Sequence, residues 1–127
     1  MFEDLTITRM AEALAAHSGA RLGLIARNVA QADTPGYKAT DLPSFADSYQ
    51  EAELHGMRAT RPGHLDSRSQ MMDPVPQPSG GEMSPDGNTV SVEREMVRSV
   101  DVRQQHDMAL AVYRNTTDII RASLGRR

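Results

Sequence analysis

The sequence predicts an all-α protein whose long N- and C-terminal helices pack together as an antiparallel-type coiled-coil hairpin. Apolar residues recur at helical spacing from residue 10 to residue 32 and again from residue 92 to residue 124. Residues 39–90 hold six of the seven prolines, and proline interrupts both helices and sheets. We therefore expect two long helices joined by an irregular, partly disordered middle segment.

The chain is expected to form one domain made of three parts. Residues 1–38 are assigned to the N-terminal helix and its Thr-Pro-Gly turn, residues 39–90 to the irregular middle segment, and residues 91–127 to the C-terminal helix. Leu, Ile, Val and Phe make up only 23 of the 127 residues, while the net charge is a modest -3. This composition predicts helices that need a partner's surface to bury their apolar faces, rather than a fully disordered chain.

The N-terminal helix is expected to begin between Leu5 and Met10 and to end near Ala32. Thr34-Pro35-Gly36 would stop it, since proline disfavours helical geometry in the preceding residue and Pro-Gly suits the centre of a tight turn. Leu24 falls off the expected apolar seam. That seam consists of Met10, Leu14, Ser18, Leu22, Ile25, Val29 and Ala32. The opposite, polar face is expected to carry Glu12, Arg21 and Arg27.

Within the middle segment, three shorter features are predicted. Residues 47–57 are expected to form a short helix. Residues 71–81 hold alternating prolines followed by two glycines, which suits an extended or polyproline-like linker. Residues 84–89 form a cluster of turn-favouring residues just before the last helix.

The C-terminal helix is expected to begin after Ser91, a favourable N-cap residue, and to end at Gly125. Glu93 and Glu95 lie in its first turn, where carboxylates favour the helix dipole. The expected seam consists of Val92, Met96, Ser99, Arg103, His106, Leu110, Tyr113, Thr117, Ile120 and Leu124. A second apolar flank consists of Val97, Val100, Met108, Val112 and Ile119. Two flanks predict contacts with more than one neighbour.

No catalytic, cofactor-binding or metal-binding residues are predicted. The four histidines lie in four different segments without metal-ligand spacing, and the chain has no cysteine. His106 and Asp107 are interpreted as a helix surface pair, because neither a nucleophile nor a cleft accompanies them. We therefore expect a protein that is not an enzyme and takes no small-molecule substrate. Its mild acidity also argues against nucleic-acid binding.

Two tests address the location of the protein. No apolar segment of the kind found in secretory signal peptides follows the acidic N-terminus. No apolar run approaches the length of a membrane span. Taken alone, these tests predict a cytoplasmic protein.

The most specific motif is the eleven-residue stretch from Asn28 to Lys38, which reads NVAQADTPGYK. It closely resembles the N-terminal signature of the bacterial flagellar rod and hook family. The match departs from the family at Gln31, where asparagine is usual. The matching signature residues are Asn28, Ala30, Thr34, Pro35, Gly36 and Tyr37.

Two further motifs narrow the resemblance to the proximal rod proteins of that family. Residues 60–65, TRPGHL, are similar to a central Pro-x-His-hydrophobic element. Residues 86–90, DGNTV, followed by EREM at 93–96, resemble the start of the family's last helix. The short chain has no large inserted domain, which favours a proximal rod protein over a distal rod or hook protein. The sister proximal rod protein FlgC stays open as an alternative.

The resemblance implies a mechanical function. Family members stack helically into the hollow drive shaft that links the membrane ring and export gate to the distal rod. The implied partners are copies of the chain itself, rod subunits of the FlgC type, the rod-base adaptor FliE, the membrane-ring protein FliF and the flagellar export gate. The implied location is the periplasmic rod of the flagellum basal body, reached by flagellar type III export without a cleaved signal peptide. This implication replaces the cytoplasmic prediction.

The residues expected to form the coiled-coil and subunit interface are Leu22, Ile25, Val29, Leu110, Tyr113, Ile120 and Leu124. Two other classes of function stay open. A soluble helical adaptor or export chaperone would bind a partner's amphipathic helix as a stably folded monomer or dimer. A small hydrolase would need a cleft and a nucleophile-base pair that the sequence does not show.

Overall fold

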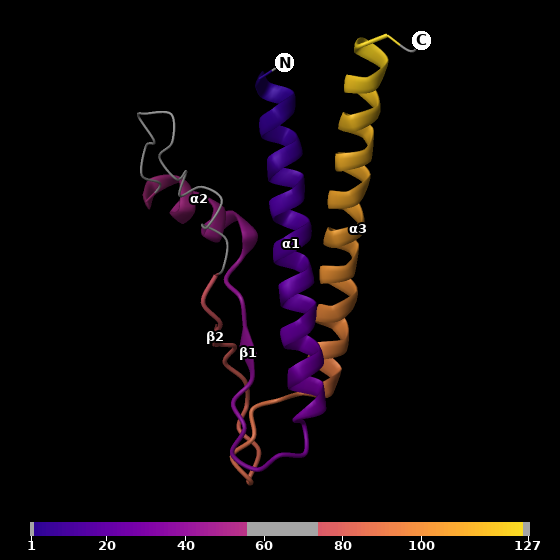
Figure 1. Cartoon of the computed structure of the whole chain (residues 1–127). Helices are drawn as coiled ribbons and strands as arrows, with labels where there is room; N and C mark the ends of the chain where they lie inside the picture. The colour runs from indigo at the N-terminus through magenta and orange to yellow at the C-terminus, as the bar shows by residue number, and fades with distance from the viewer. Residues whose placement is uncertain (1, 56–73, 126–127) are drawn as a thin grey trace.

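The computed structural model describes the backbone of residues 2–55 and 74–125 and the side chains of residues 6–50 and 74–125. Its elements are, in chain order, α1 (Phe2–Ala30), β1 (Thr40–Asp41), α2 (Phe45–His55), β2 (Gln77–Pro78) and α3 (Val92–Ser123). α1 and α3 lie side by side and run in opposite directions, so that both termini are at the same end of the molecule (Figure 1). The predicted helical hairpin is confirmed.

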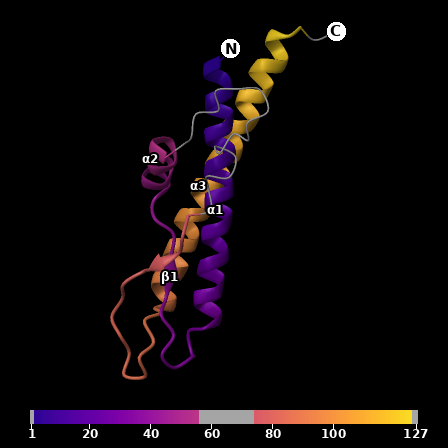
Figure 2. The same ribbon diagram turned by 60° about the vertical axis from the view of Figure 1, so that its left-hand side comes forward.

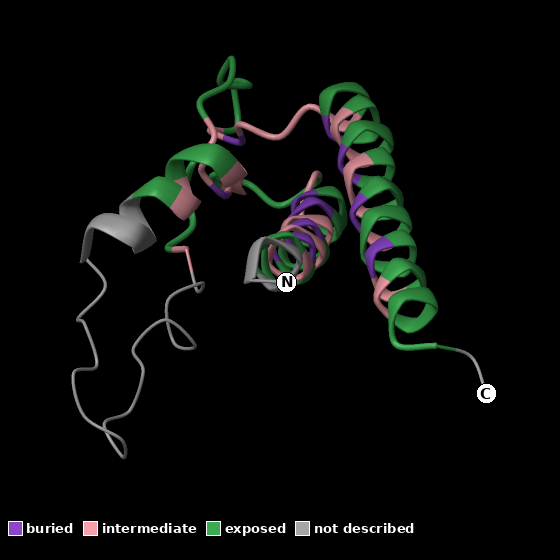
Figure 3. Cartoon of the chain, turned by 90° about the horizontal axis from the view of Figure 1, so that it is seen from above, coloured by how far each residue is buried: buried purple, intermediate pink, exposed green. Residues whose placement is uncertain are grey.

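A second, thinner layer lies against α1 on the side away from α3, and consists of β1, β2 and α2 (Figure 2 and Figure 3). The two short strands pair antiparallel, with Thr40 opposite Pro78 and Asp41 opposite Gln77. Ser79 N–H also donates to Ala39 O at 2.9 Å, which extends the pairing by one bond. The middle segment is thus more ordered than expected in its described parts. The motif at 60–65 lies outside the described residues.

The predicted helix boundaries agree with the structure to within a few residues. α1 begins at Phe2, earlier than expected, and ends at Ala30, two residues before Ala32. α2 begins at Phe45, two residues early, because Ser44 caps it: Asp47 N–H donates to Ser44 Oγ at 3.2 Å.

The ends of α3 follow the local sequence signals. Ser91 is the N-cap, and its side chain accepts a hydrogen bond from Arg94 N–H. Gly125, with φ of 78°, follows the last turn and takes the left-handed conformation that commonly ends a helix. Both predictions are confirmed.

The expected seam of α1 was wrong at several positions. Met10 and Val29 are 42% and 38% exposed, whereas Leu24, expected off the seam, is buried. The buried face includes Ala11 and Ile25. The error arises because α1 is covered from two sides, by α3 and by the strand layer, so that its buried surface is wider than a single seam.

The expected seam of α3 was displaced by about one residue. The buried positions recur every seven residues and are Glu95, Val102, Ala109 and Thr116. They lie on the side of α3 that faces α1 (Figure 3). Three of these four residues are small or polar, so hydrophobicity gave little indication of this face.

Candidate functional site

The signature stretch forms a tight turn directly after α1. Tyr37 N–H donates to Thr34 O at 3.3 Å, with Pro35 and Gly36 at the two central positions. Gly36 has φ of 74°, a backbone conformation that the third position of a type II turn requires and that glycine adopts without strain. The predicted Pro-Gly turn is confirmed. It sends the chain back along α1 into β1.

Asn28 is the centre of a buried hydrogen-bond group, which we call the Asn28 cluster: Asn28, Tyr37, Thr40 and Glu95. Its Nδ2 donates to Thr40 O at 2.8 Å and to Glu95 Oε2 at 3.1 Å. Its Oδ1 accepts from Tyr37 O–H and from Thr40 N–H, both at 3.2 Å. Every donor and acceptor position of this completely buried amide is therefore used. One side chain ties α1 to the turn, to β1 and to α3.

Asn88 binds the turn that follows α1 from a distant part of the chain. Its Nδ2 lies 3.0, 2.7 and 2.9 Å from the carbonyl oxygens of Gln31, Ala32 and Thr34. Its Oδ1 accepts from Val90 N–H at 2.7 Å. These three carbonyls follow Ala30, the last residue of α1, so the amide supplies donors to the backbone of the turn rather than to the helix. The turn before α3 thereby holds the turn after α1.

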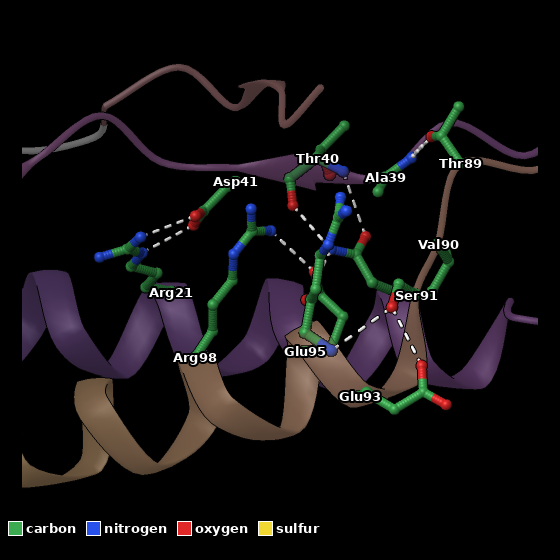
Figure 4. Close-up of polar contacts among 12 residues, drawn as sticks. Arg21, Ala39, Thr40, Asp41, Thr89, Val90, Ser91, Glu93, Glu95 and Arg98 are labelled. Atoms are coloured by element: carbon green, nitrogen blue, oxygen red, sulfur yellow. Dashed lines mark hydrogen bonds and ion pairs between the residues drawn. The ribbon is translucent and has the colours of Figure 1, made fainter. Parts of the chain in front are cut away.

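Glu95 lies in the first turn of α3, as expected, and is only 2% exposed. Its second carboxylate oxygen accepts a hydrogen bond from Arg98 Nη1 at 2.8 Å. Together with the bond from Asn28, this gives both oxygens a partner, which a buried carboxylate requires. Figure 4 shows Glu95 and Arg98 of α3 lying beneath the strand that carries Thr40.

Arg21 was expected on the polar face of α1, which was wrong. Its guanidinium donates two hydrogen bonds, each 2.7 Å, to the two carboxylate oxygens of Asp41 on β1 (Figure 4). Burial by itself would raise the pKa of the Asp41 carboxyl. The hydrogen bonds and charge of Arg21 outweigh that effect and hold the pKa below its usual value. This ion pair fastens the strand layer to α1.

His17 fastens the same layer one turn further toward the N-terminus. Its Nε2–H donates to Pro43 O at 3.0 Å, and its ring meets Phe45 edge-on with the ring centres 5.7 Å apart. Its Nδ1 is buried and has no hydrogen-bond partner within the part of the chain that the structure describes. Burial lowers the pKa of this imidazole, and the nearby charge of Arg21 acts in the same direction. Both effects favour the neutral form of the ring.

The signature residues divide into two groups. Asn28 and Tyr37 belong to the Asn28 cluster, whereas Ala30, Thr34, Pro35 and Gly36 are exposed. At the departure from the family pattern, Gln31 Oε1 accepts a hydrogen bond from Thr34 Oγ1 at 2.6 Å. The altered residue thus still contacts the turn.

The seven residues expected at the coiled-coil and subunit interface are spread over different environments. Ile25 is buried, and Leu22, Leu110 and Ile120 are half-buried. Val29 and Tyr113 are just over a third exposed, and Leu124 is 70% exposed. The more exposed members leave apolar surface uncovered in the single chain.

No arrangement suited to catalysis occurs among the described residues. His106 and Asp107 lie 3.9 Å apart on the surface of α3 and are 33% and 72% exposed, as the surface-pair interpretation predicted. No three histidine or acidic side chains gather in a metal-binding group within residues 6–50 and 74–125. No described helix combines the length and the apolar character needed to cross a membrane.

Asn88, Glu95 and Arg21 are the functional residues that sequence reasoning missed. Asn88 was noted only as part of a turn motif, and its partners lie more than 50 residues away. For Glu95 a signal existed: it begins the seven-residue repeat that continues with Val102, Ala109 and Thr116. Following that repeat, rather than the most apolar positions, would have placed Glu95 on the buried face.

The chain matches no family model, but it is similar to several curated proteins of known name. It is 34% identical over 101 residues to the flagellar basal body rod protein FlgB of Escherichia coli (strain K12), and the match covers 72% of each chain. It is 30% identical over 93 residues, 69% of each chain, to the protein of the same name from Agrobacterium fabrum. It is 36% identical over 84 residues, 59% of each chain, to that of Aeromonas hydrophila.

Proposed function

The chain belongs to the FlgB family of flagellar basal body rod proteins, and from this premise we propose that it is a structural subunit of the proximal rod. In this proposal many copies stack helically and form part of the hollow drive shaft between the membrane ring with its export gate and the distal rod. The role is mechanical rather than catalytic. What supports it beyond the relatives is the uncovered apolar surface of α3.

That surface, which we call the outer stripe, consists of Val97, Val100, Met108 and Ile119. These residues are 63%, 66%, 55% and 64% exposed, respectively. At 100° per residue, all four fall within one side of the helix. The outer side of a helix in a self-sufficient hairpin is expected to be polar, so several large apolar side chains exposed on that side favour an interaction site. The outer stripe is the single observation that best supports assembly.

Stacking into an open tube requires heterologous contacts, in which one surface of a subunit meets a different surface of the next. α3 offers one side to α1 and the outer stripe to a neighbouring subunit, so that a single helix takes part in two interfaces. Val29, Tyr113 and Leu124 add exposed apolar area on the hairpin. We propose that the seven expected interface residues are divided between intrachain packing and subunit contacts in this way.

The proposed partners are copies of this chain, rod subunits of the FlgC type, the adaptor FliE, the ring protein FliF and the export gate. The proposed location is the periplasmic rod, and the proposed route is flagellar type III export without a cleaved signal peptide. The alternatives are the role of the sister protein FlgC and that of a soluble adaptor or chaperone. A soluble adaptor would stay out of purified basal bodies.

The proposal is tested by Val100→Glu combined with Met108→Glu, expressed in a strain that lacks the native copy. We expect helix content by circular dichroism to match the parent, because both side chains are already exposed. We also expect the variant to be absent from purified basal bodies and cells to lose motility, since each carboxylate would have to be buried at the interface. Arg114→Glu, an exposed position outside the outer stripe, is the matched control and should assemble.

Two results would overturn the proposal at different levels. Normal motility with the double glutamate variant would remove the outer stripe from the assembly surface. Failure of the unmodified chain to copurify with basal bodies would reject the rod function itself.

A further inference from the structure

The apolar residues between α1 and α3 do little by themselves to fix how far one helix is slid along the other. On α1, Ala11, Ser18 and Ile25 are buried at intervals of seven residues. On α3, Val102, Ala109 and Thr116 are buried at the same interval. Sliding one helix by seven residues, about 10 Å, replaces two of the three residues on that helix by another of the same set. Most of them are small, so the burial of apolar surface discriminates weakly between the two registers.

The polar residues Asn28 and Glu95 distinguish one register from another. They are 0% and 2% exposed and are joined directly, Nδ2 to Oε2, across the two helices. Any slide by seven residues separates them and leaves a buried amide N–H without its carboxylate partner. Buried polar groups that lose a partner destabilise a fold far more than the same contact stabilises it. A single buried polar pair can therefore specify alignment where apolar residues do not.

The side chains that Glu95 or Asn28 would meet after a slide already have hydrogen-bond partners. A slide in one direction would bring Glu95 level with Arg21, but that guanidinium already donates two hydrogen bonds to Asp41. The other three hydrogen bonds of Asn28, one with Tyr37 and two with Thr40, hold the turn and β1 in place. The register of the helices is thus coupled to the position of the strand layer.

We propose that the Asn28–Glu95 pair sets the register of α1 against α3. Both are positioning residues, and their effect is on alignment rather than on overall stability. The inference concerns the subunit alone. It has one consequence that rests on the proposed function: the register determines where along the hairpin the outer stripe is presented to a neighbouring subunit.

The absence of cysteine from the chain allows the register to be measured directly. Spin labels are attached at Arg27→Cys and Arg114→Cys, two exposed positions on the two helices. Arg27 lies one residue, and Arg114 lies 19 residues, from the level at which Asn28 meets Glu95, both toward the end that carries the termini. The two labels are therefore offset by 18 residues, or about 27 Å along the hairpin axis. Because this offset is mainly axial, a slide by seven residues changes the distance between the labels by about 10 Å. Double electron-electron resonance resolves such a change.

In the labelled parent we expect one distance maximum. The decisive variant carries Asn28→Leu and Glu95→Leu together, so that neither side chain of the pair is left buried without the other and the helices stay paired. We expect helix content to be retained and a second maximum to appear, displaced by about 10 Å. Glu95→Gln keeps an acceptor for Asn28 and should keep the single maximum. Asn115→Leu, the same chemical change at an exposed site of α3, should also keep it.

A single maximum at the parent distance in the double leucine variant would overturn the proposal. So would loss of helix content with a featureless distance distribution in that variant, since the pair would then be needed for folding rather than for register. Neither result bears on whether the chain enters basal bodies. The register inference and the proposed function therefore fail independently.

Discussion

Asn88→Ala provides the sharpest test of how the two ends of the hairpin are joined. The Asn88 side chain is 2% exposed, and its amide group bridges the turn after α1 and the turn before α3. It donates toward the carbonyls of Gln31, Ala32 and Thr34 and accepts from Val90 N–H. Alanine removes all of these contacts without introducing a clash.

The size of the effect follows from the number of bonds lost. An amide nitrogen carries two hydrogens, so the three carbonyls share about two hydrogen bonds, and the bond from Val90 N–H makes a third. At about 1 kcal/mol for each bond, the free energy of unfolding should fall by about 3 kcal/mol. For a chain of this length that corresponds to a decrease in Tm of about 10 °C.

Thermal unfolding followed by far-ultraviolet circular dichroism measures this decrease. Asn115→Ala is the control, because Asn115 is exposed on α3 and its replacement should change stability by less than about 0.5 kcal/mol. Asn88→Asp keeps the acceptor for Val90 but removes both donors and places a carboxylate beside the carbonyl oxygens. It should therefore destabilise at least as much as alanine. If either Asn88 variant unfolds at the same temperature as the parent, Asn88 does not hold the two turns together.

Three further predictions concern the turn, the histidine and the helix ends. Gly36→Ala should lower the free energy of unfolding by about 1 kcal/mol, because the positive φ strains an L-residue. Gly19→Ala, in the exposed middle of α1, should raise it by about 1 kcal/mol. Urea unfolding that shifts both variants in the same direction would contradict this prediction. The pKa of His17 is lower in the folded chain than in the unfolded chain, so the unfolded chain binds more protons between those values. The free energy of unfolding should therefore fall as the pH is lowered from about 6.5, as measured by chemical unfolding at each pH. This fall should vanish in His17→Phe and persist in the control His106→Gln. Hydrogen exchange of the dilute subunit should show α1 and α3 poorly protected, most of all at the free ends far from the Asn28 cluster; full protection along both helices would argue against a subunit that depends on assembly.

Several features of this protein were determined by the sequence alone, because they depend on residues close together in the chain. Ser91 caps α3 and Gly125 ends it through contacts within a few residues. The Pro-Gly turn depends only on the φ preferences of Pro35 and Gly36. The two long helices follow from periodicity, and the eleven-residue signature indicates the family through the identity and order of its residues.

The tertiary structure decided which faces are buried and which polar groups are paired. Met10 and Leu24 exchanged their expected environments because α1 is covered from two sides, and the second cover, β1 with β2, has almost no local signal. Asn28 and Glu95 are 67 residues apart, so the hydrogen bond between them has no signal in the local sequence of either residue. A buried amide or carboxylate is stable only where its partners converge. Only the folded chain brings them together, and periodicity along one helix carries no information about the side chains that meet it from another.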